Sequence, residues 1–153
     1  MSASSGHVEY VTARIGDQFF GLPISQVQDV FAPQRLTAVP LAGPEIAGLL
    51  NLRGRIVTMV DMRRRLDIEV KDEDRRRMAI GVEYKGESYG LLIDEIGDVV
   101  NLPLAGREDN PINLDPRLAR VSSGVHRLDG RLMVVLDVER VLEIGASAAA
   151  RAA

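Results

Sequence analysis

The chain contains no cysteine and no tryptophan, and only 4% of its 153 residues are aromatic. Without cysteine there is no disulfide, no iron–sulfur cluster and no thiol catalysis. No apolar run approaches the roughly 20 residues that a membrane-spanning helix needs. The stretch MSASSGHVEY lacks the basic and apolar segments of a secretion signal. We therefore expect a cytoplasmic protein whose core is built from Val, Ile, Leu and Met.

Two blocks of sequence occur twice, in the same order. QFFGLPISQVQDV, from Gln18, is repeated as SYGLLIDEIGDVV from Ser88. AGLLNLRGRIVTMVDMRRRL, from Ala47, is repeated as SGVHRLDGRLMVVLDVERVL from Ser123. Ordered repeats of this kind indicate two similar halves. A half of roughly 60 residues would bury too little surface to be stable alone, so we expect the halves to share a core.

Each half is predicted to consist of short strands joined by tight turns. Alternating apolar residues predict strands from His7, over QFFGLPI and over Met78–Tyr84. Gly54 supplies the positive φ of a tight hairpin turn, and Asp61 is placed to cap a helical turn that ends at Leu66. The residues alone therefore predict an all-β protein made of two small β-barrels packed on each other.

Short helical turns are expected at four further places in this β-rich chain. Ser25 and Gln28 fit a capping box, with Ser25 as the N-cap. Asp94 occupies the equivalent place in the second half and is also a good N-cap residue. Further turns are predicted over 116–119, which begins with proline, and over 138–144.

No residue pattern supports catalysis. The two histidines, His7 and His126, fall in a tail and in a strand, and no cluster has metal-ligand spacing. There is no phosphate-binding loop and no nucleophile elbow. Asp61 and Asp137 lie at equivalent strand-to-helix junctions, which favours capping over an acid–base pair. We expect no enzyme activity, no metal and no cofactor.

Arginine-rich stretches over 63–65 and 75–77 raise nucleic-acid binding as an alternative function, because small β-barrels often bind nucleic acid. The formal net charge is nevertheless −3, and an acidic stretch, 69–74, lies between the arginine runs. No strand interleaves aromatic residues for base stacking. A solvated linker between the halves is the favoured interpretation, and no nucleic-acid partner is expected.

The tip of the first central hairpin is not explained by turn chemistry. In the second half, Asp129 precedes Gly130, and Asp-Gly is a strong turn pair. At the equivalent place Arg53 precedes Gly54, where arginine gives the turn no special help. Either Arg53 is selected for a contact, or it simply points into water; the sequence leaves both open.

The segments GLPISQVQDV, GLLNLRGRIVTMVDMRRRL and GLLIDEIGDVVNL, with the closing hairpin, together resemble the CheW family of chemotaxis adaptors. The motif Asn51, Leu52, Arg53, Gly54, followed by an apolar strand and VDMR, carries most of the specificity. One departure is Thr58, where family members often have proline.

The resemblance implies one domain over 9–145 made of two five-stranded SH3-like barrels, with interleaved halves of about 17–66 and 78–142. Outside this domain, the small polar residues 1–6 and the alanine-rich end 146–153 are expected to be flexible tails. The resemblance further implies a non-enzymatic adaptor that links transmembrane chemoreceptors to the histidine kinase CheA, whose regulatory domain has the same fold. Such an adaptor lies at the inner face of the membrane, which it meets only through receptor arrays.

The resemblance also implies that the receptor's cytoplasmic tip, a helical hairpin, docks in a groove between the barrels. An apolar strip with few charges suits the apolar face of a helix. As plain core residues, Val27, Val30, Ile96 and Val99 would have no such role, and the sequence leaves that alternative open. Other barrel faces would contact CheA, and no residues are predicted for them. The positions matching the groove are Val27, Asp29, Val30, Gly48, Arg53, Met78, Ile96 and Val99.

Overall fold

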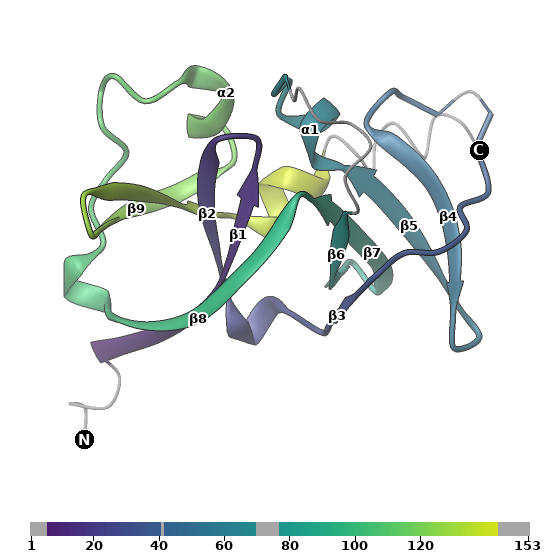
Figure 1. The fold of residues 1–153 in the computed structure, drawn as a ribbon, viewed down its shortest axis with the longest axis horizontal. Coiled ribbons are helices and arrows are strands. Elements are labelled where there is room, and N and C mark those ends of the chain that lie inside the picture. The colour runs from purple at the N-terminus through teal and green to yellow at the C-terminus, as the bar shows by residue number, and fades with distance from the viewer. Residues whose placement is uncertain (1–5, 41, 70–76, 144–153) are drawn as a thin grey trace.

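The computed structural model describes residues 6–40, 42–69 and 77–143. Its strands form two five-stranded sheets (Figure 1). Sheet 1 has the order β8-β1-β2-β10-β9, and sheet 2 has the order β3-β6-β7-β5-β4. The prediction of an all-β protein with two five-stranded units is confirmed. The predicted tails and acidic linker fall mostly outside the described residues.

The strand bounds follow the alternating apolar pattern closely. Sheet 1 contains β1 His7–Ile15, β2 Gln18–Pro23, β8 Glu95–Pro103, β9 Ser122–Leu128 and β10 Arg131–Leu136. Sheet 2 contains β3 Asp29–Phe31, β4 Ile46–Leu52, β5 Arg55–Asp61, β6 Met78–Tyr84 and β7 Glu87–Ile93.

Each sheet takes strands from both halves of the sequence. The first half gives β1 and β2 to sheet 1 and β3, β4 and β5 to sheet 2, and the second half does the reverse. The repeat makes β1 equivalent to β6, and likewise β2 to β7, β3 to β8, β4 to β9 and β5 to β10. With these equivalences the two sheets have the same strand order. Neither half can therefore complete a sheet by itself.

A pair of equivalent glycines allows a short segment to join the edge of each sheet. Gly48 has a φ of +150° and Gly124 a φ of +146°. A Cβ at Gly48 would lie 2.7 Å from the Thr37 carbonyl oxygen, and one at Gly124 would lie 2.8 Å from that of Glu108. Thr37 and Glu108 each form an isolated bridge to the residue that follows the glycine. Any larger residue would push these segments away.

The main core contains buried side chains from both sheets, including Ile15, Phe20 and Leu22 of sheet 1 and Val60 and Leu91 of sheet 2. Each sheet also contains a smaller apolar cluster of its own, separate from the main core. The outer cluster of sheet 1 contains Tyr10, Met133 and Val135 with the half-buried Phe19, Val100 and Leu128 packed on them. The outer cluster of sheet 2 contains Val57, Met59, Ala79 and Leu92 with Phe31, Leu50 and Leu52 packed on them.

The predicted capping box at Ser25 and Gln28 is wrong. The 3-10 turn η2, Ile24–Gln26, has Pro23 as its N-cap and no side-chain cap. Ser25 therefore lies inside the turn, where its hydroxyl cannot act as the cap. The Gln28 amide instead donates to Glu83 Oε1 at 2.9 Å, across the pairing of β3 with β6.

The predicted helical turn after Asp94 is also wrong. The chain passes directly from β7 through Asp94 into β8. The Asp94 carboxylate accepts from the Gly16 N–H at 2.6 Å and from Arg63 Nε at 2.7 Å, so tertiary contacts use the groups that a cap would have used.

The other short helices are as expected. Asp61 caps α1, Met62–Arg65, by accepting from the Arg63 N–H at 3.0 Å. Asp137 accepts from the Arg140 N–H at 3.3 Å at the start of a helix over residues 138–143. Asp115 caps α2, Pro116–Ala119. A further 3-10 turn, η3, spans Leu104–Gly106. None of the helices in the described part of the chain is long and apolar enough to cross a membrane.

Candidate functional site

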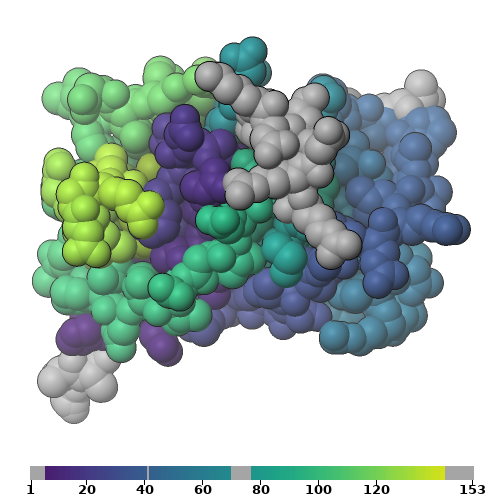
Figure 2. All heavy atoms as spheres, in the orientation of Figure 1, coloured from purple at the N-terminus to yellow at the C-terminus, as the bar shows by residue number. Residues whose placement is uncertain are grey.

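The candidate groove residues lie mainly on or beside the edge strands β3 and β8. These strands hold equivalent places at the edges of the two sheets and reach the same face of the molecule (Figures 1 and 2). Asp29 and Val30 belong to β3, and Ile96 and Val99 belong to β8. Val30 and Val99 are equivalent positions of the repeat and lie almost 70 residues apart in the sequence. The fold thus brings equivalent residues of the two halves to one face.

Burial divides the apolar residues of this face into two groups. Val30 is 38% exposed and Val99 is 51% exposed, so they are not core residues. Val27, Met78 and Ile96 are half-buried and pack against the main core. The face therefore combines a supported apolar floor with two exposed valines on equivalent strands.

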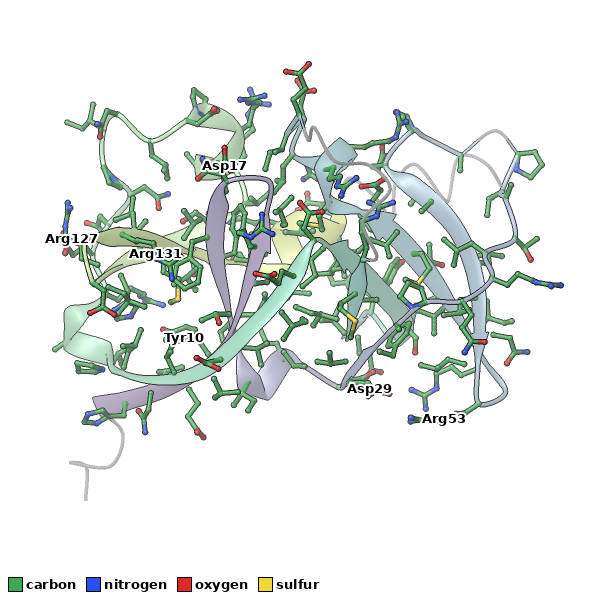
Figure 3. The ribbon with its side chains drawn as sticks, viewed as in Figure 1. Tyr10, Asp17, Asp29, Arg53, Arg127 and Arg131 are labelled. Atoms are coloured by element: carbon green, nitrogen blue, oxygen red, sulfur yellow. The ribbon has the colours of Figure 1, made fainter. Side chains whose placement is uncertain are left out.

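Arg53 and Asp29 form an ion pair at the end of sheet 2, with 3.2 Å between the Arg53 guanidinium and Asp29 Oδ2. Figure 3 shows the two side chains pointing toward each other. The Arg53 side chain remains 79% exposed. Arg53 therefore has one contact within the chain and is otherwise open to solvent, and a role in binding a partner stays a prediction. An exposed pair of this kind contributes only about 0–1 kcal/mol to stability.

The hairpin tip holds Arg53 in an unfavourable backbone conformation. Its φ is +54° and that of Gly54 is +81°, the signs that a two-residue hairpin turn requires. The Asn51 side chain supports the turn by accepting from the Gly54 N–H at 2.9 Å. Leu52 packs on the outer cluster of sheet 2. The motif therefore builds a hydrogen-bonded turn in which Arg53 takes a backbone conformation better suited to glycine or asparagine.

A cavity of about 460 Å³ opens beside this ion pair. Its walls combine apolar side chains with charged groups at the rim. The lining residues are Gln28, Asp29, Phe31, Leu52, Arg53, Arg55, Val57, Gly81, Ser88 and Tyr89.

Gly48 differs from the other candidate groove residues. It is buried, and the space that its side chain would take is occupied by the Thr37 backbone. Gly48 therefore has a structural role: it leaves room for the Thr37 backbone to pair with β4.

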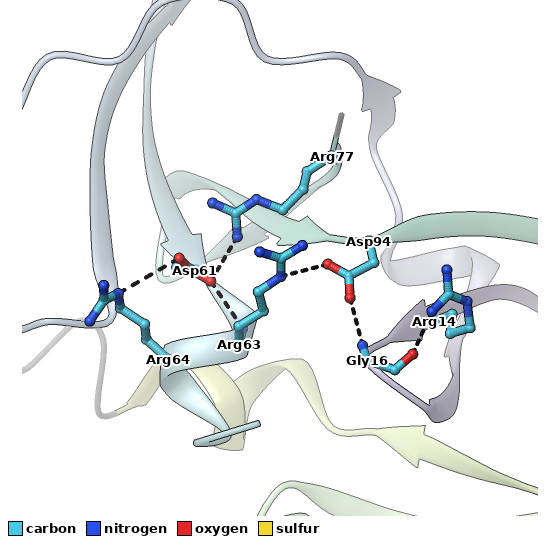
Figure 4. A network of polar contacts seen from close by, with 7 residues as sticks. All are labelled: Arg14, Gly16, Asp61, Arg63, Arg64, Arg77 and Asp94. Carbon is cyan, nitrogen blue, oxygen red and sulfur yellow. Dashed lines mark hydrogen bonds and ion pairs between the residues drawn. The ribbon is translucent and has the colours of Figure 1, made fainter. Parts of the chain in front are cut away.

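Sequence reasoning missed a polar network at the junction of the sheets (Figure 4). Arg63 Nε lies 2.7 Å from Asp94 Oδ1, and Asp94 also accepts from Gly16 in the turn between β1 and β2. Arg77 lies 2.9 Å from Asp61 Oδ1. The network ties α1 and β5 of sheet 2 to the β1–β2 turn of sheet 1. A signal was present in the sequence, because Asp94 ends the apolar run LLI, where a carboxylate needs a cation.

The prediction that the arginine run over 63–65 is a solvated linker is wrong for two of its members. The Arg63 side chain is only 11% exposed. Arg65 donates to the carbonyl oxygens of Val141 at 2.9 Å and Arg140 at 3.1 Å. Burial lowers the pKa of Arg65. Arg64 alone is exposed, at 66%.

Beside the network lies a larger cavity of about 960 Å³ with strongly charged walls. Most of its carboxylates face guanidinium groups. The Arg117 guanidinium and N–H hold the pKa of Asp115 down to about 2. Within residues 6–40, 42–69 and 77–143, no three His, Asp or Glu side chains are grouped to hold a metal ion. The ion pairs in this cavity join structural elements: Arg117 contacts both Asp115 and Asp67, and Arg77 contacts Asp61.

His126 is a packed residue of sheet 1. It is 3% exposed and lies edge-on to Tyr10, with ring centroids 5.5 Å apart. The Tyr10 hydroxyl lies 3.5 Å from His126 Nε2. Burial lowers the pKa of His126 and raises the pKa of Tyr10. The expectation that His126 lies in a strand is confirmed, whereas the expectation that His7 lies in a tail is wrong, because His7 begins β1.

Comparison with known proteins identifies the family. A model described as a CheW-like domain matches residues 9–145. The chain is 27% identical over 135 residues to the chemotaxis protein CheW of Thermotoga maritima, covering 88% of this chain and 87% of that protein. It is 28% identical over 127 residues to the chemotaxis protein CheW of Bacillus subtilis, covering 81% and 80%.

A solved structure has the same fold. The crystal structure of the scaffolding protein TtCheW from Thermoanaerobacter tengcongensis matches with a TM-score of 0.81 at 23% sequence identity. The match covers 89% of this chain and 92% of that one. The arrangement of the two sheets in this chain is therefore that of a known fold.

Proposed function

We propose a function from the premise that this chain belongs to the CheW family, whose model matches residues 9–145. The protein is a coupling adaptor of chemotaxis signalling, and the family acts as a non-enzymatic scaffold. We propose that its partners are the cytoplasmic tip of a chemoreceptor and the regulatory domain of the histidine kinase CheA. Bound to receptors, it lies at the inner face of the membrane.

The receptor is proposed to dock on the face that carries β3 and β8. The observation that supports this is the pair of exposed valines, Val30 and Val99, on equivalent edge strands. Val27 and Ile96 provide a firm apolar floor, since both pack on the main core. The apolar face of a helical hairpin would cover this strip. Arg53 would then lie at one end of the contact.

The nucleic-acid alternative loses the feature that suggested it. Arg63, Arg65 and Arg77 are engaged within the fold, with Asp94, with backbone carbonyls and with Asp61. Of the four arginines of these stretches that the structure describes, only Arg64 is left exposed for phosphate binding.

A binding experiment tests the proposed partners. The purified chain is mixed with a receptor cytoplasmic fragment and with CheA, separately and together, and complexes are measured by pull-down and analytical ultracentrifugation. We expect binary complexes with each partner and a ternary complex with both. Failure to bind either partner at micromolar concentration would contradict the proposal.

A further inference from the structure

The outer clusters of the two sheets occupy equivalent positions but contain side chains of different size. The registers fix the equivalence, because Thr12 pairs with Gly21 in sheet 1 as Gly81 pairs with Gly90 in sheet 2. Sheet 1 has large side chains at several positions where sheet 2 has small ones. The pairs, sheet 1 first, are Tyr10 and Ala79, Phe19 and Ser88, and Met133 and Val57.

In sheet 1, an aromatic ring fills the position beside the last hairpin. Phe19 is half-buried on the outer cluster, and the Arg131 guanidinium lies over its ring, 4.1 Å from the centroid. Phe19 belongs to β2 and Arg131 begins β10, the two strands that run parallel in this sheet. The contact is a cation–π interaction within the chain.

In sheet 2, the arginine is kept and the ring is absent. Arg55 begins β5, as Arg131 begins β10, and Ser88 on β7 takes the place of Phe19. Arg55 is exposed and contacts the Ser88 hydroxyl at 3.4 Å, a long hydrogen bond. Both residues line the cavity of about 460 Å³, whose apolar walls include Phe31, Leu52, Val57 and Tyr89.

We propose that this cavity receives an aromatic side chain of the docked receptor, in the position that Phe19 fills in sheet 1. Arg55 stacks on the entering ring as Arg131 stacks on Phe19. Asp29 and Arg53 border the cavity and also belong to the proposed receptor-binding face, so the two surfaces are continuous. The identity of the docking protein rests on the proposed function, whereas the aromatic chemistry rests on the comparison of the two sheets.

A small aromatic probe tests the cavity without a partner protein. N-acetyl-phenylalaninamide is titrated into the full chain and followed by amide chemical shifts, with binding expected on the order of 1 mM for a molecule of this size. We expect shifts at Leu52, Arg55, Ser88 and Tyr89. Ser88→Phe should abolish them, because the new ring fills the cavity from within. Shifts that persist in the Ser88→Phe variant, or that occur elsewhere only, would overturn the proposal.

Two further variants separate a specific effect from a change in folding. Glu87→Phe places the same ring on the neighbouring, exposed residue of β7, outside the cavity lining, and should leave probe binding intact. Arg55→Ala should lower the affinity for N-acetyl-phenylalaninamide by about two- to fivefold, which corresponds to the energy of an exposed cation–π contact. The affinity for N-acetyl-leucinamide, which has no ring, should not change in Arg55→Ala. An equal loss of affinity for both probes would contradict the stacking role of Arg55.

The receptor fragment completes the test. Ser88→Phe should weaken its binding at least tenfold, and Glu87→Phe should not. If the wild-type chain binds the receptor and Ser88→Phe binds it equally well, the cavity is not used and the inference fails, while the proposed function stands. If the wild-type chain does not bind the receptor at all, the proposed function fails, and the probe titration still decides whether the cavity takes an aromatic side chain.

Discussion

Arg63 and Asp94 form the most buried ion pair in the described part of the chain, with 2.7 Å between Arg63 Nε and Asp94 Oδ1. Only 11% of the arginine side chain and 3% of the aspartate side chain are exposed. Arg63 lies in α1, directly after a strand of sheet 2, and Asp94 also binds the β1–β2 turn of sheet 1 through Gly16. The pair therefore joins the two sheets at a point where the repeat exchanges strands.

Arg63→Ala should lower the free energy of unfolding by about 3–5 kcal/mol, because it leaves the Asp94 carboxylate buried without its cation. Arg64→Ala is the matched control, since Arg64 is 66% exposed and lies 4.0 Å from Asp61; its effect should stay within about 0.5 kcal/mol. Urea denaturation followed by circular dichroism measures both. A loss below about 1 kcal/mol for Arg63→Ala would mean that the pair is not holding the sheets together.

Arg53→Ala should separate binding from stability. The ion pair with Asp29 is exposed, so its loss should lower the free energy of unfolding by no more than about 1 kcal/mol. Receptor binding should nevertheless weaken, because Arg53 lies on the proposed docking face. Arg127→Ala removes a comparable exposed pair with Glu108, at 3.2 Å in sheet 1, and should leave receptor binding unchanged. Equal effects of the two variants on receptor affinity would contradict a specific role for Arg53.

The local features of the fold could be predicted from the sequence. The hairpin at Gly54 and the cap at Asp61 depend on residues close together in the chain, and the repeat revealed that the two halves are alike. The two capping failures have different causes. The turn begins at Ile24, before the residue predicted to cap it, so Ser25 lies inside the turn. Asp94 has a side chain suited to capping, but its carboxylate accepts from Gly16 and Arg63, which tertiary structure brings to it. The Arg63–Asp94 contact likewise needs the tertiary arrangement.

The candidate site could be predicted only in part. The family resemblance placed Val30 and Val99 on the docking face, and the structure shows them exposed on equivalent strands. Nothing in the spacing of residues indicated the cavity near Ser88. Ser88, which lines the cavity, stands where sheet 1 has Phe19, and that comparison requires the strand registers.

His126 should make the protein less stable at mildly acidic pH. Burial lowers the pKa of His126 in the folded state below its ordinary value near 6.5. The unfolded chain then binds a proton more readily than the folded one, so stability is greatest above pH 6.5 and falls as the pH decreases through the folded-state pKa. Thermal melts between pH 7.5 and pH 5 should show this decline. It should be smaller in His126→Gln, which cannot titrate; an identical decline in both would assign it to other groups.

Val99→Ala should weaken receptor binding with little effect on stability. Val99 is 51% exposed in the free protein, so truncating it removes few internal contacts. If a receptor helix covers it, the two lost methyl groups, at roughly 0.8 kcal/mol each for full burial, correspond to a loss of affinity between about fourfold and fifteenfold. Ile96→Ala should behave differently, because Ile96 packs on the main core and its truncation lowers the melting temperature as well. Ile112→Ala is the control for an exposed apolar residue away from the face, at 106% exposure, and should change neither quantity. Affinity for the receptor fragment and melting temperature are measured for all three variants. A Val99→Ala protein that binds the receptor like wild type would remove β8 from the docking face.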